Sequence, residues 1–232
     1  MRPLSEVKTT LKQKGHRTLL ISLLLMILAS PFLSTNPMSN WLLAVILMLV
    51  LLAAARTVAG QGRQFQIALV LGTAALLSQF GVLGIQWAWL EITRYAATSL
   101  FLFWVCGLLL GDIILRSHKV TLDLLLGAVN VYLMIAVGFA FTYSLIEHLQ
   151  PGAFTGLEEL VNTSDRVLYF LYFSFITIST LGYGDISPLT QHGMTVAYVE
   201  AVFGQFYLAI LVARLVAIYI EQTRATDQAS KS

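Results

Sequence analysis

The sequence predicts an all-α membrane protein with six transmembrane helices, plus a shorter re-entrant helix and a loop between the last two. Three observations support this fold class. The 232 residues are 57% hydrophobic and only 11% charged, whereas a soluble domain is usually about 25% charged. Six apolar runs are each long enough to cross a bilayer, which takes about 20 residues. A seventh apolar segment is too short to cross, and a stretch containing two glycines follows it.

The six predicted spans follow one another along the chain. Lipid offers no partners to backbone amides and carbonyls, so we expect each span to be helical. Polar turns with glycine or proline at 34–37 and 60–63 separate the first three spans. The predicted spans cover residues 18–35, 38–59, 65–85, 94–115, 121–147 and 192–221.

The first apolar run is also compatible with a secretory signal peptide, because basic residues precede it. These residues are Lys8, Lys12, Lys14 and Arg17. No clear small-residue cleavage site follows, Pro31 interrupts the end of the run, and further apolar runs come at once. We therefore predict that this run is retained as the first span.

The positions of lysine and arginine predict the orientation, because cytoplasmic loops carry an excess of both. With the N-terminus in the cytoplasm, only Arg94 and Arg166 of the 14 basic residues fall outside. The outer loops then carry mainly acidic residues, which raise the local cation concentration. We expect a multi-pass plasma-membrane protein, in the inner membrane of a bacterium, with both termini cytoplasmic.

The region between the last two spans is divided into a polar and an apolar part. Residues 150–164 are polar and predict an exposed turret, whereas residues 165–179 are apolar and aromatic. About 15 residues of helix reach roughly 22 Å, too short to span a bilayer. The apolar part therefore predicts a re-entrant helix that enters the membrane and stops there.

Residues 180–185, Thr-Leu-Gly-Tyr-Gly-Asp, follow this helix. Gly182 and Gly184 can take backbone angles that other residues avoid, which lets successive carbonyl oxygens point toward one axis. A ring of such carbonyls can replace the water shell of a cation. This stretch therefore predicts a cation pathway.

This stretch, the short helix before it and the long span after it resemble the potassium channel superfamily, whose filter reads Thr-Val-Gly-Tyr-Gly. The resemblance covers roughly residues 121–221. It implies an outer helix, pore helix, filter and inner helix, with four chains around one axis. Backbone carbonyls would hold K+, together with the threonine hydroxyl, and two further residues would form the outer mouth. The implied K+ ligands are Thr180, Leu181, Gly182 and Tyr183, and the implied mouth residues are Gly184 and Asp185.

The resemblance also implies residues that support the filter. Tyr172 and Phe173 match the aromatic cuff that braces the filter, against which Tyr183 should pack; ordinary helix packing is the alternative. Gly204 matches the gating-hinge glycine of the inner helix, with close helix packing as its alternative.

Helical periodicity from this glycine places a set of side chains along the pore. Gln205, Leu208 and Val212 face the central cavity, with Gln205 below the filter, and Val216 and Ile220 face the inner mouth.

Glu200 is the most costly residue in any predicted span. An acidic residue inside a membrane is a functional candidate by default. We expect it to be protonated, bonded to Thr177 or Ser179 of the pore helix, or exposed to water behind the filter. A structural role in holding the helix pair is favoured over a role in gating.

Six spans with a pore between the last two also resemble voltage-gated channels, but the fourth span lacks the charges of a voltage sensor. Moving one charge through 100 mV is worth roughly 2.3 kcal/mol, so steep gating needs several arginines in one span. Residues 95–115 contain no lysine or arginine. We therefore predict weak or absent voltage dependence.

Three further polar residues have open interpretations. His148 and His192 flank the expected outer mouth and titrate near neutral pH, which makes them candidates for proton sensing; solvated loop residues are the alternative. Asn130, in the middle of the fifth span, is expected to make an interhelical hydrogen bond.

The predicted chain has four parts. Residues 1–17 form a basic cytoplasmic segment and residues 18–118 a four-helix domain like a voltage sensor without its arginines. Residues 119–222 form the pore domain and residues 223–232 a cytoplasmic tail.

The expected function is passive, potassium-selective conduction across a lipid bilayer by a homotetramer, with K+ as the permeant ion. The alternatives are a less selective cation channel and a non-conducting regulatory or sensor subunit that keeps the pore fold. The net charge of +2 is too small to indicate nucleic-acid binding. No Ser/His or paired-Asp site and no metal-ligand cluster indicates an enzyme, and no cofactor is expected.

Overall fold

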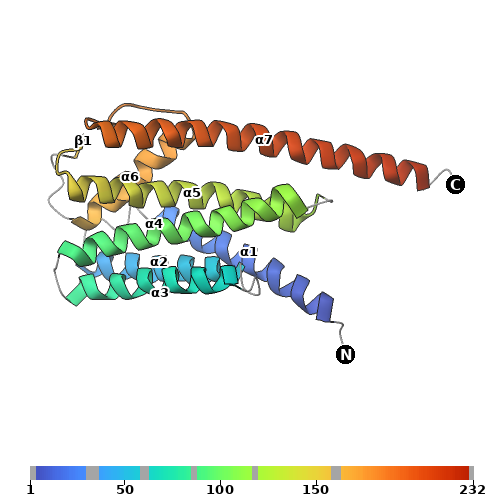
Figure 1. Cartoon of the computed structure of the whole chain (residues 1–232), viewed down its shortest axis with the longest axis horizontal. Helices are drawn as coiled ribbons and strands as arrows, with labels where there is room; N and C mark the ends of the chain where they lie inside the picture. The colour runs from blue at the N-terminus through green and yellow to red at the C-terminus, as the bar shows by residue number, and fades with distance from the viewer. Residues whose placement is uncertain are drawn as a thin grey trace.

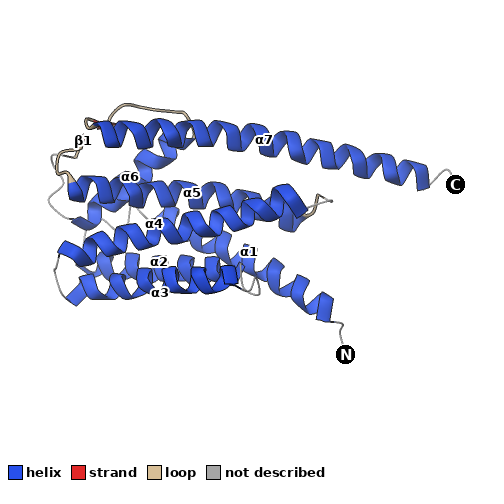
Figure 2. Ribbon diagram, viewed as in Figure 1, coloured by secondary structure: helices blue, strands red, loops and turns tan. Residues whose placement is uncertain are grey.

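The computed structural model describes residues 4–29, 37–57, 63–84, 88–116, 120–157 and 163–229. Helices make up nearly all of these residues (Figure 2). The strands found within the described ranges form one short antiparallel pair. The all-α prediction is therefore confirmed for this part of the chain.

The first four helices each lie on one of the first four predicted spans. They are α1 (Leu4–Ala29), α2 (Pro37–Thr57), α3 (Arg63–Gly84) and α4 (Ala88–Gly111), and α4 continues as the π-helix η2 (Asp112–Arg116). Helix α1 begins well before position 18, so most of the basic N-terminal segment is helical as well. The predicted end of the first span, residues 30–35, lies outside the described residues.

The remaining elements are three helices and the two strands. They are α5 (Leu122–Leu149), β1 (Phe154–Thr155), α6 (Thr163–Ile178), β2 (Ser187–Pro188) and α7 (Gln191–Ala229). Helix α6 has 16 residues, about 24 Å, and is therefore as short as the re-entrant prediction requires. Helix α7 continues past the predicted end of the last span at residue 221.

Three helices in the described part of the chain are long and apolar enough to cross a membrane. They are Trp89–Ile114, Leu122–Leu149 and Gln191–Arg224. Shorter apolar helices occupy Gly15–Ala29, Leu42–Thr57 and Arg166–Ile178. The structure is therefore that of a helical membrane protein, and the count of six spans stays a prediction.

Helix α5 occupies the centre of the bundle. It packs against α1, α4, α6 and α7, and 72% of its apolar span is buried, against 17% for α7. Figure 1 shows α7 on the side of α5 opposite to α2 and α3, with its last turns projecting beyond the bundle. Both termini lie at the end from which α7 projects (Figure 1).

Polar contacts fix α5 to its neighbours. The Asn130 Nδ2 atom donates to the carbonyl oxygen of His16 in α1 at 2.8 Å, so the predicted interhelical hydrogen bond is confirmed. The Tyr207 hydroxyl of α7 donates to the Ala128 carbonyl at 2.6 Å. At the start of α5 the Thr121 hydroxyl accepts from the Leu124 amide and caps the helix.

Candidate functional site

The loop after α6 turns back on the helix end through its own amides. The Thr180 amide donates to the carbonyl of Thr177 at 2.9 Å, and the Leu181 and Gly182 amides donate to the carbonyl of Ile176 at 2.8 and 3.1 Å. These bonds satisfy carbonyls that the last turn of a helix otherwise leaves without partners. The amides at the start of the loop therefore point toward α6.

Every second residue of this loop has a left-handed backbone. Thr180, Gly182 and Gly184 have φ angles of 59°, 55° and 81°, whereas Leu181 and Tyr183 do not have positive φ. The two glycines were predicted to use this freedom, and this is confirmed. Thr180 was not predicted, and a β-branched residue in this region is a genuine outlier. It costs of the order of 1–3 kcal/mol, and such strain concentrates at functional sites.

The amides and the carbonyls of the loop differ in their partners. The amides of Thr180, Leu181 and Gly182 are engaged by the end of α6, so the carbonyls of the same stretch are the backbone groups left for other partners. Within the described residues, no hydrogen bond reaches the carbonyl oxygens of Thr180, Leu181, Gly182 or Tyr183. Residues 180–185 are all exposed in the single chain, and the loop runs along the side of α7 that faces away from α5 (Figure 1). These carbonyls are thus available to a ligand.

The outer end of the loop is attached to α6 by one side-chain hydrogen bond. The Tyr172 hydroxyl donates to the Asp185 carboxylate at 2.7 Å. A tyrosine hydroxyl is protonated at neutral pH, so it can donate this bond. Tyr172 therefore contacts the Asp185 end of the loop, and its role in an aromatic cuff stays a prediction.

The other two aromatic side chains do not follow the cuff prediction within one chain. Phe173 is buried and its ring contacts Tyr143 and Phe154, with centroids 4.9 and 5.7 Å away. Tyr183 remains 67% exposed and makes no ring contact with Tyr172 or Phe173 in the described part of the chain. Packing of Tyr183 against a cuff therefore requires another copy of the chain.

The segment predicted as an exposed turret is partly buried, which corrects the prediction for residues 150–157. Strand β1 pairs with β2 beyond the loop, and Phe154 is buried. The Glu147 carboxylate accepts from the amides of Gly152 at 2.9 Å and Phe154 at 3.2 Å. Gly156 approaches so closely that a Cβ there would lie 2.2 Å from the Asp185 carbonyl oxygen. The turret therefore packs against the loop at Asp185.

Helix α7 contacts the inner end of the loop at two neighbouring residues. The Gln205 Nε2 atom donates to the Thr180 hydroxyl at 3.0 Å, which puts this amide directly below the loop, as predicted. Gly204 is buried, and a Cβ there would lie 2.2 Å from the Ile178 carbonyl oxygen. The structure therefore shows close packing at Gly204, the alternative to a hinge; a bend is not needed to explain this glycine.

Glu200 joins three helices behind the loop. Its side chain is fully buried. It accepts one hydrogen bond from the Tyr143 hydroxyl of α5 at 2.5 Å and another from the Ser174 hydroxyl of α6. The Ser174 hydroxyl also contacts the Ala136 carbonyl of α5 at 2.7 Å. One carboxyl group thus connects the outer, short and last helices.

The partners predicted for Glu200 were wrong. The hydroxyls of Thr177 and Ser179 donate to the carbonyls of Phe173 and Phe175 in their own segment, both at 2.7 Å. Exposure to water behind the loop is also excluded within the chain, because Glu200 has no accessible surface.

The remaining predicted pore-lining side chains are unburied in the single chain. These side chains lie on the same face of α7 as Gln205. All four are exposed: Leu208, Val212, Val216 and Ile220. Their role stays a prediction, because a single chain leaves this face uncovered.

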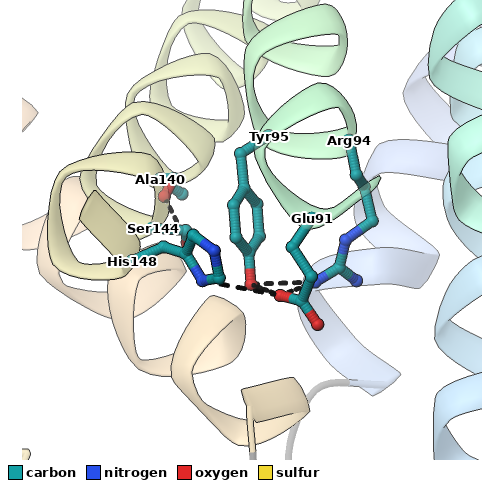
Figure 3. Close-up of polar contacts among 6 residues, drawn as sticks. All are labelled: Glu91, Arg94, Tyr95, Ala140, Ser144 and His148. Carbon is teal, nitrogen blue, oxygen red and sulfur yellow. Dashed lines mark hydrogen bonds and ion pairs between the residues drawn. The ribbon is translucent and has the colours of Figure 1, made fainter. Parts of the chain in front are cut away.

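A polar cluster joins the start of α4 to the end of α5 (Figure 3). Arg94 donates to the Glu91 carboxylate at 3.3 Å and to the Tyr95 hydroxyl at 2.8 Å, and Tyr95 donates to Glu91 at 3.0 Å. His148 lies 4.0 Å from the same carboxylate. Arg94 is therefore bonded to two residues of its own helix.

The other histidine that was predicted to flank the mouth, His192, lies near the turret. The Nδ1 atom of His192 is 3.5 Å from the side-chain Nε2 atom of Gln150. Proton sensing by His148 or His192 stays a prediction. Within the residues described, no group of three or more His, Cys, Asp or Glu side chains is placed to hold a metal ion.

Comparison with known proteins identifies this region. Residues 129–221, which contain most of α5, all of α6, the loop and most of α7, match the model of a family described as "Ion channel". Protein LctB of Bacillus caldotenax is 32% identical over 126 residues, which cover 50% of this chain and 92% of that protein. Protein LctB of Geobacillus stearothermophilus is 30% identical over 125 residues, with the same coverage. No solved structure matches the chain significantly. The chain belongs to the ion channel family.

Proposed function

We propose that four copies of this chain form a potassium-selective channel that conducts K+ passively across the plasma membrane. Each copy contributes six spans, with both termini in the cytoplasm. Thr180, Leu181, Gly182 and Tyr183 hold dehydrated K+ with their carbonyls, and Gly184 and Asp185 form the outer mouth. The proposal assigns the chain no catalytic activity and no cofactor.

The geometry of the loop is the observation that carries this proposal. Its early amides are directed back to α6, its backbone has positive φ at Thr180, Gly182 and Gly184, and its carbonyls from Thr180 to Tyr183 have no partner within the described chain. Carbonyl oxygens that are removed from water without a hydrogen-bond partner cost free energy, unless a ligand or an ordered water satisfies them. A cation without its water shell is the ligand that such oxygens suit.

The assembly follows from what one chain leaves incomplete. One loop supplies one side of a ring of carbonyls. Helix α7 is buried over only 17% of its apolar span, far less than a helix enclosed by protein. Four copies would cover its exposed faces with neighbouring chains and with the central cavity lined by Gln205, Leu208 and Val212.

Weak or absent voltage dependence is part of the proposal. Between Tyr95 and the end of α4 there is no lysine or arginine. Arg94, at the outer end, is tied to Glu91 and Tyr95 of the same helix. Without several charges that can cross the field, the membrane potential supplies too little work for steep gating.

Purified full-length protein in liposomes tests the proposal. We expect K+ flux down a K+ gradient, little Na+ flux under the same conditions, and a reversal potential that follows K+. Comparable K+ and Na+ fluxes would favour a less selective cation channel. No flux of either ion, over a range of pH and lipid composition, would favour a non-conducting subunit.

A pair of glycine variants provides the control for this experiment. Gly182 and Gly152 both have positive φ, and a Cβ would meet nothing within 4 Å at either position. Alanine therefore imposes similar backbone strain at both sites without a clash. We expect Gly182→Ala to lose selective K+ flux and Gly152→Ala, in the turret, to keep it. Equal loss in the two variants would mean that backbone strain in general, and not the filter, explains the effect.

The outer mouth gives a further prediction. Tyr172→Phe removes the hydroxyl that donates to Asp185 but keeps the ring, so we expect steady K+ flux to fall while the melting temperature of the assembly changes little. Tyr169→Phe is the matched control, because Tyr169 is an equally exposed tyrosine of α6 whose hydroxyl has no hydrogen bond in the described part of the chain. Unchanged flux in Tyr172→Phe would show that the Asp185 contact does not hold the mouth.

A further inference from the structure

The first residue of the loop is bonded to α7 through its side chain. The Gln205 Nε2 atom donates to the Thr180 hydroxyl oxygen at 3.0 Å. Among the described residues, no other hydrogen bond involves this hydroxyl. Both side chains are exposed in the single chain. Within the described chain, the Gln205 amide is therefore the polar group that acts on the Thr180 hydroxyl.

The backbones on either side of this bond are held close together. Gly204 is buried, and a Cβ there would lie 2.2 Å from the Ile178 carbonyl oxygen. Ile178 lies two positions before Thr180, and Gly204 is the residue next to Gln205. The close approach of α7 to the end of α6 thus places the Gln205 amide within reach of the hydroxyl.

The bond changes what the Thr180 hydroxyl can offer a cation. A hydroxyl oxygen has two lone pairs and one hydrogen. The Gln205 N–H occupies one lone pair and directs the positive end of its dipole at the oxygen. A cation that approaches the same oxygen meets one remaining lone pair and an opposing dipole. This opposition is stronger inside a protein than in water, because the dielectric constant is lower there.

We propose that Gln205 is a positioning residue that weakens cation binding at the Thr180 end of the loop and so speeds the release of K+. This inference rests on the proposed function, which makes the Thr180 hydroxyl a K+ ligand. Conduction requires binding that is weak enough for the ion to leave. In the proposed assembly each copy supplies one such amide, so four N–H groups oppose the cation at this site.

Two glutamines of α7 provide the variant and its control. Gln205→Met removes the N–H donor and keeps an unbranched side chain of similar length. Gln191→Met makes the same chemical change at an exposed residue of the first turn, about 21 Å away along the helix. The control thus reports the general effect of methionine on α7 without touching the loop.

The experiment measures cation binding and conduction separately, on the full-length assembly. Isothermal titration calorimetry measures the binding of Ba2+, which is close to K+ in size but carries twice the charge and therefore responds more strongly to the oxygens around it. We expect the dissociation constant for Ba2+ to fall about tenfold in Gln205→Met, the effect of removing one competing hydrogen bond. Gln191→Met should bind Ba2+ as the wild type does.

Currents in planar bilayers, recorded over a range of K+ concentrations, give the second measurement. In Gln205→Met we expect half-saturation at a lower K+ concentration together with a smaller maximal current, because K+ binds more tightly and leaves more slowly. A purely structural role for Gln205 would reduce the current without tightening the binding of either cation. The opposite changes in affinity and maximal current are therefore specific to the proposal.

A double variant tests whether Gln205 acts through Thr180. Thr180→Val removes the hydroxyl and keeps the branched shape, so adding Gln205→Met in that background should not change the Ba2+ dissociation constant further. If Thr180→Val does not assemble, the direction of the change in Gln205→Met decides alone. If Gln205→Met does not assemble, Gln205→Asn replaces it, because its amide is one methylene too short to reach the hydroxyl.

Two results would overturn the proposal in different ways. A wild type that conducts K+, with unchanged or weaker Ba2+ binding in Gln205→Met, would reject the role of Gln205 and leave the proposed function intact. A wild type that neither conducts K+ nor binds Ba2+ would reject the proposed function and this inference with it.

Discussion

Replacing Gly204 by alanine is expected to abolish or strongly reduce K+ flux. The new Cβ would lie 2.2 Å from the Ile178 carbonyl oxygen and 2.8 Å from the Ile178 side chain, so α6 and α7 must move apart. The displaced atoms belong to the last turn of α6, two residues before Thr180. Overpacking of this kind typically costs about 1–3 kcal/mol, and here the shift is transmitted directly to the loop. Flux in liposomes and the melting temperature of the assembly measure the two effects.

The control for Gly204 is the same substitution where there is space. Gly111→Ala adds a Cβ that meets nothing within 4 Å, and alanine in place of a helical glycine generally stabilises by about 0.5–1 kcal/mol. Normal K+ flux in Gly204→Ala would mean that α6 and α7 adapt to the methyl group without disturbing the loop. In that case the close packing at Gly204 would not be needed for conduction.

Replacing Glu200 by leucine is the second large expected effect. The Tyr143 hydroxyl then loses its acceptor in a fully buried site, at a cost of about 1–3 kcal/mol. Ser174 loses less, because it keeps the Ala136 carbonyl as an acceptor. We expect a lower melting temperature and loss of K+ flux, because α6 is no longer joined to both α5 and α7.

A second pair of variants separates hydrogen bonding from charge at this site. Glu200→Gln keeps an oxygen that can accept from Tyr143 and adds an amide that can donate to Ser174, so it should retain most of the stability. Glu200→Leu combined with Tyr143→Phe and Ser174→Ala removes all the unpaired donors, and should recover part of what Glu200→Leu loses. If Glu200→Gln is as unstable as Glu200→Leu, the carboxylate charge is required and the hydrogen-bond explanation is wrong.

The fold was predictable where long apolar runs specify a helix. The runs at 38–59 and 121–147 became α2 and α5 with ends shifted by a few residues. Helix α1 was predicted to start too late, because its first turns are polar and leave no hydropathy signal, although lysine, glutamate and leucine are good helix formers. The end of α7 was missed for the same reason.

The residues of the loop could be predicted from the sequence, but most of the contacts that hold the loop in place could not. The glycine rule identifies Gly182 and Gly184, but it cannot identify Thr180, whose positive φ occurs together with amide bonds back to α6. Helical spacing correctly placed Gln205 below the loop. The partners of Glu200 depend on the height and rotation at which three helices meet, and one of them, Tyr143, is 57 positions away. Spacing along one helix carries no information about these quantities.

The contact between Gly204 and the Ile178 carbonyl divides α7 into two unequal parts. From Gly204 to Ala229 the helix is about 37 Å long, and from Gly204 back to Gln191 it is about 20 Å long. Glu200 and Tyr207, on either side of Gly204, bond to α5 and α6 as well. These attachments lie within about 10 Å of one another along the helix, so the positions of α7 and of the loop depend on the same short stretch.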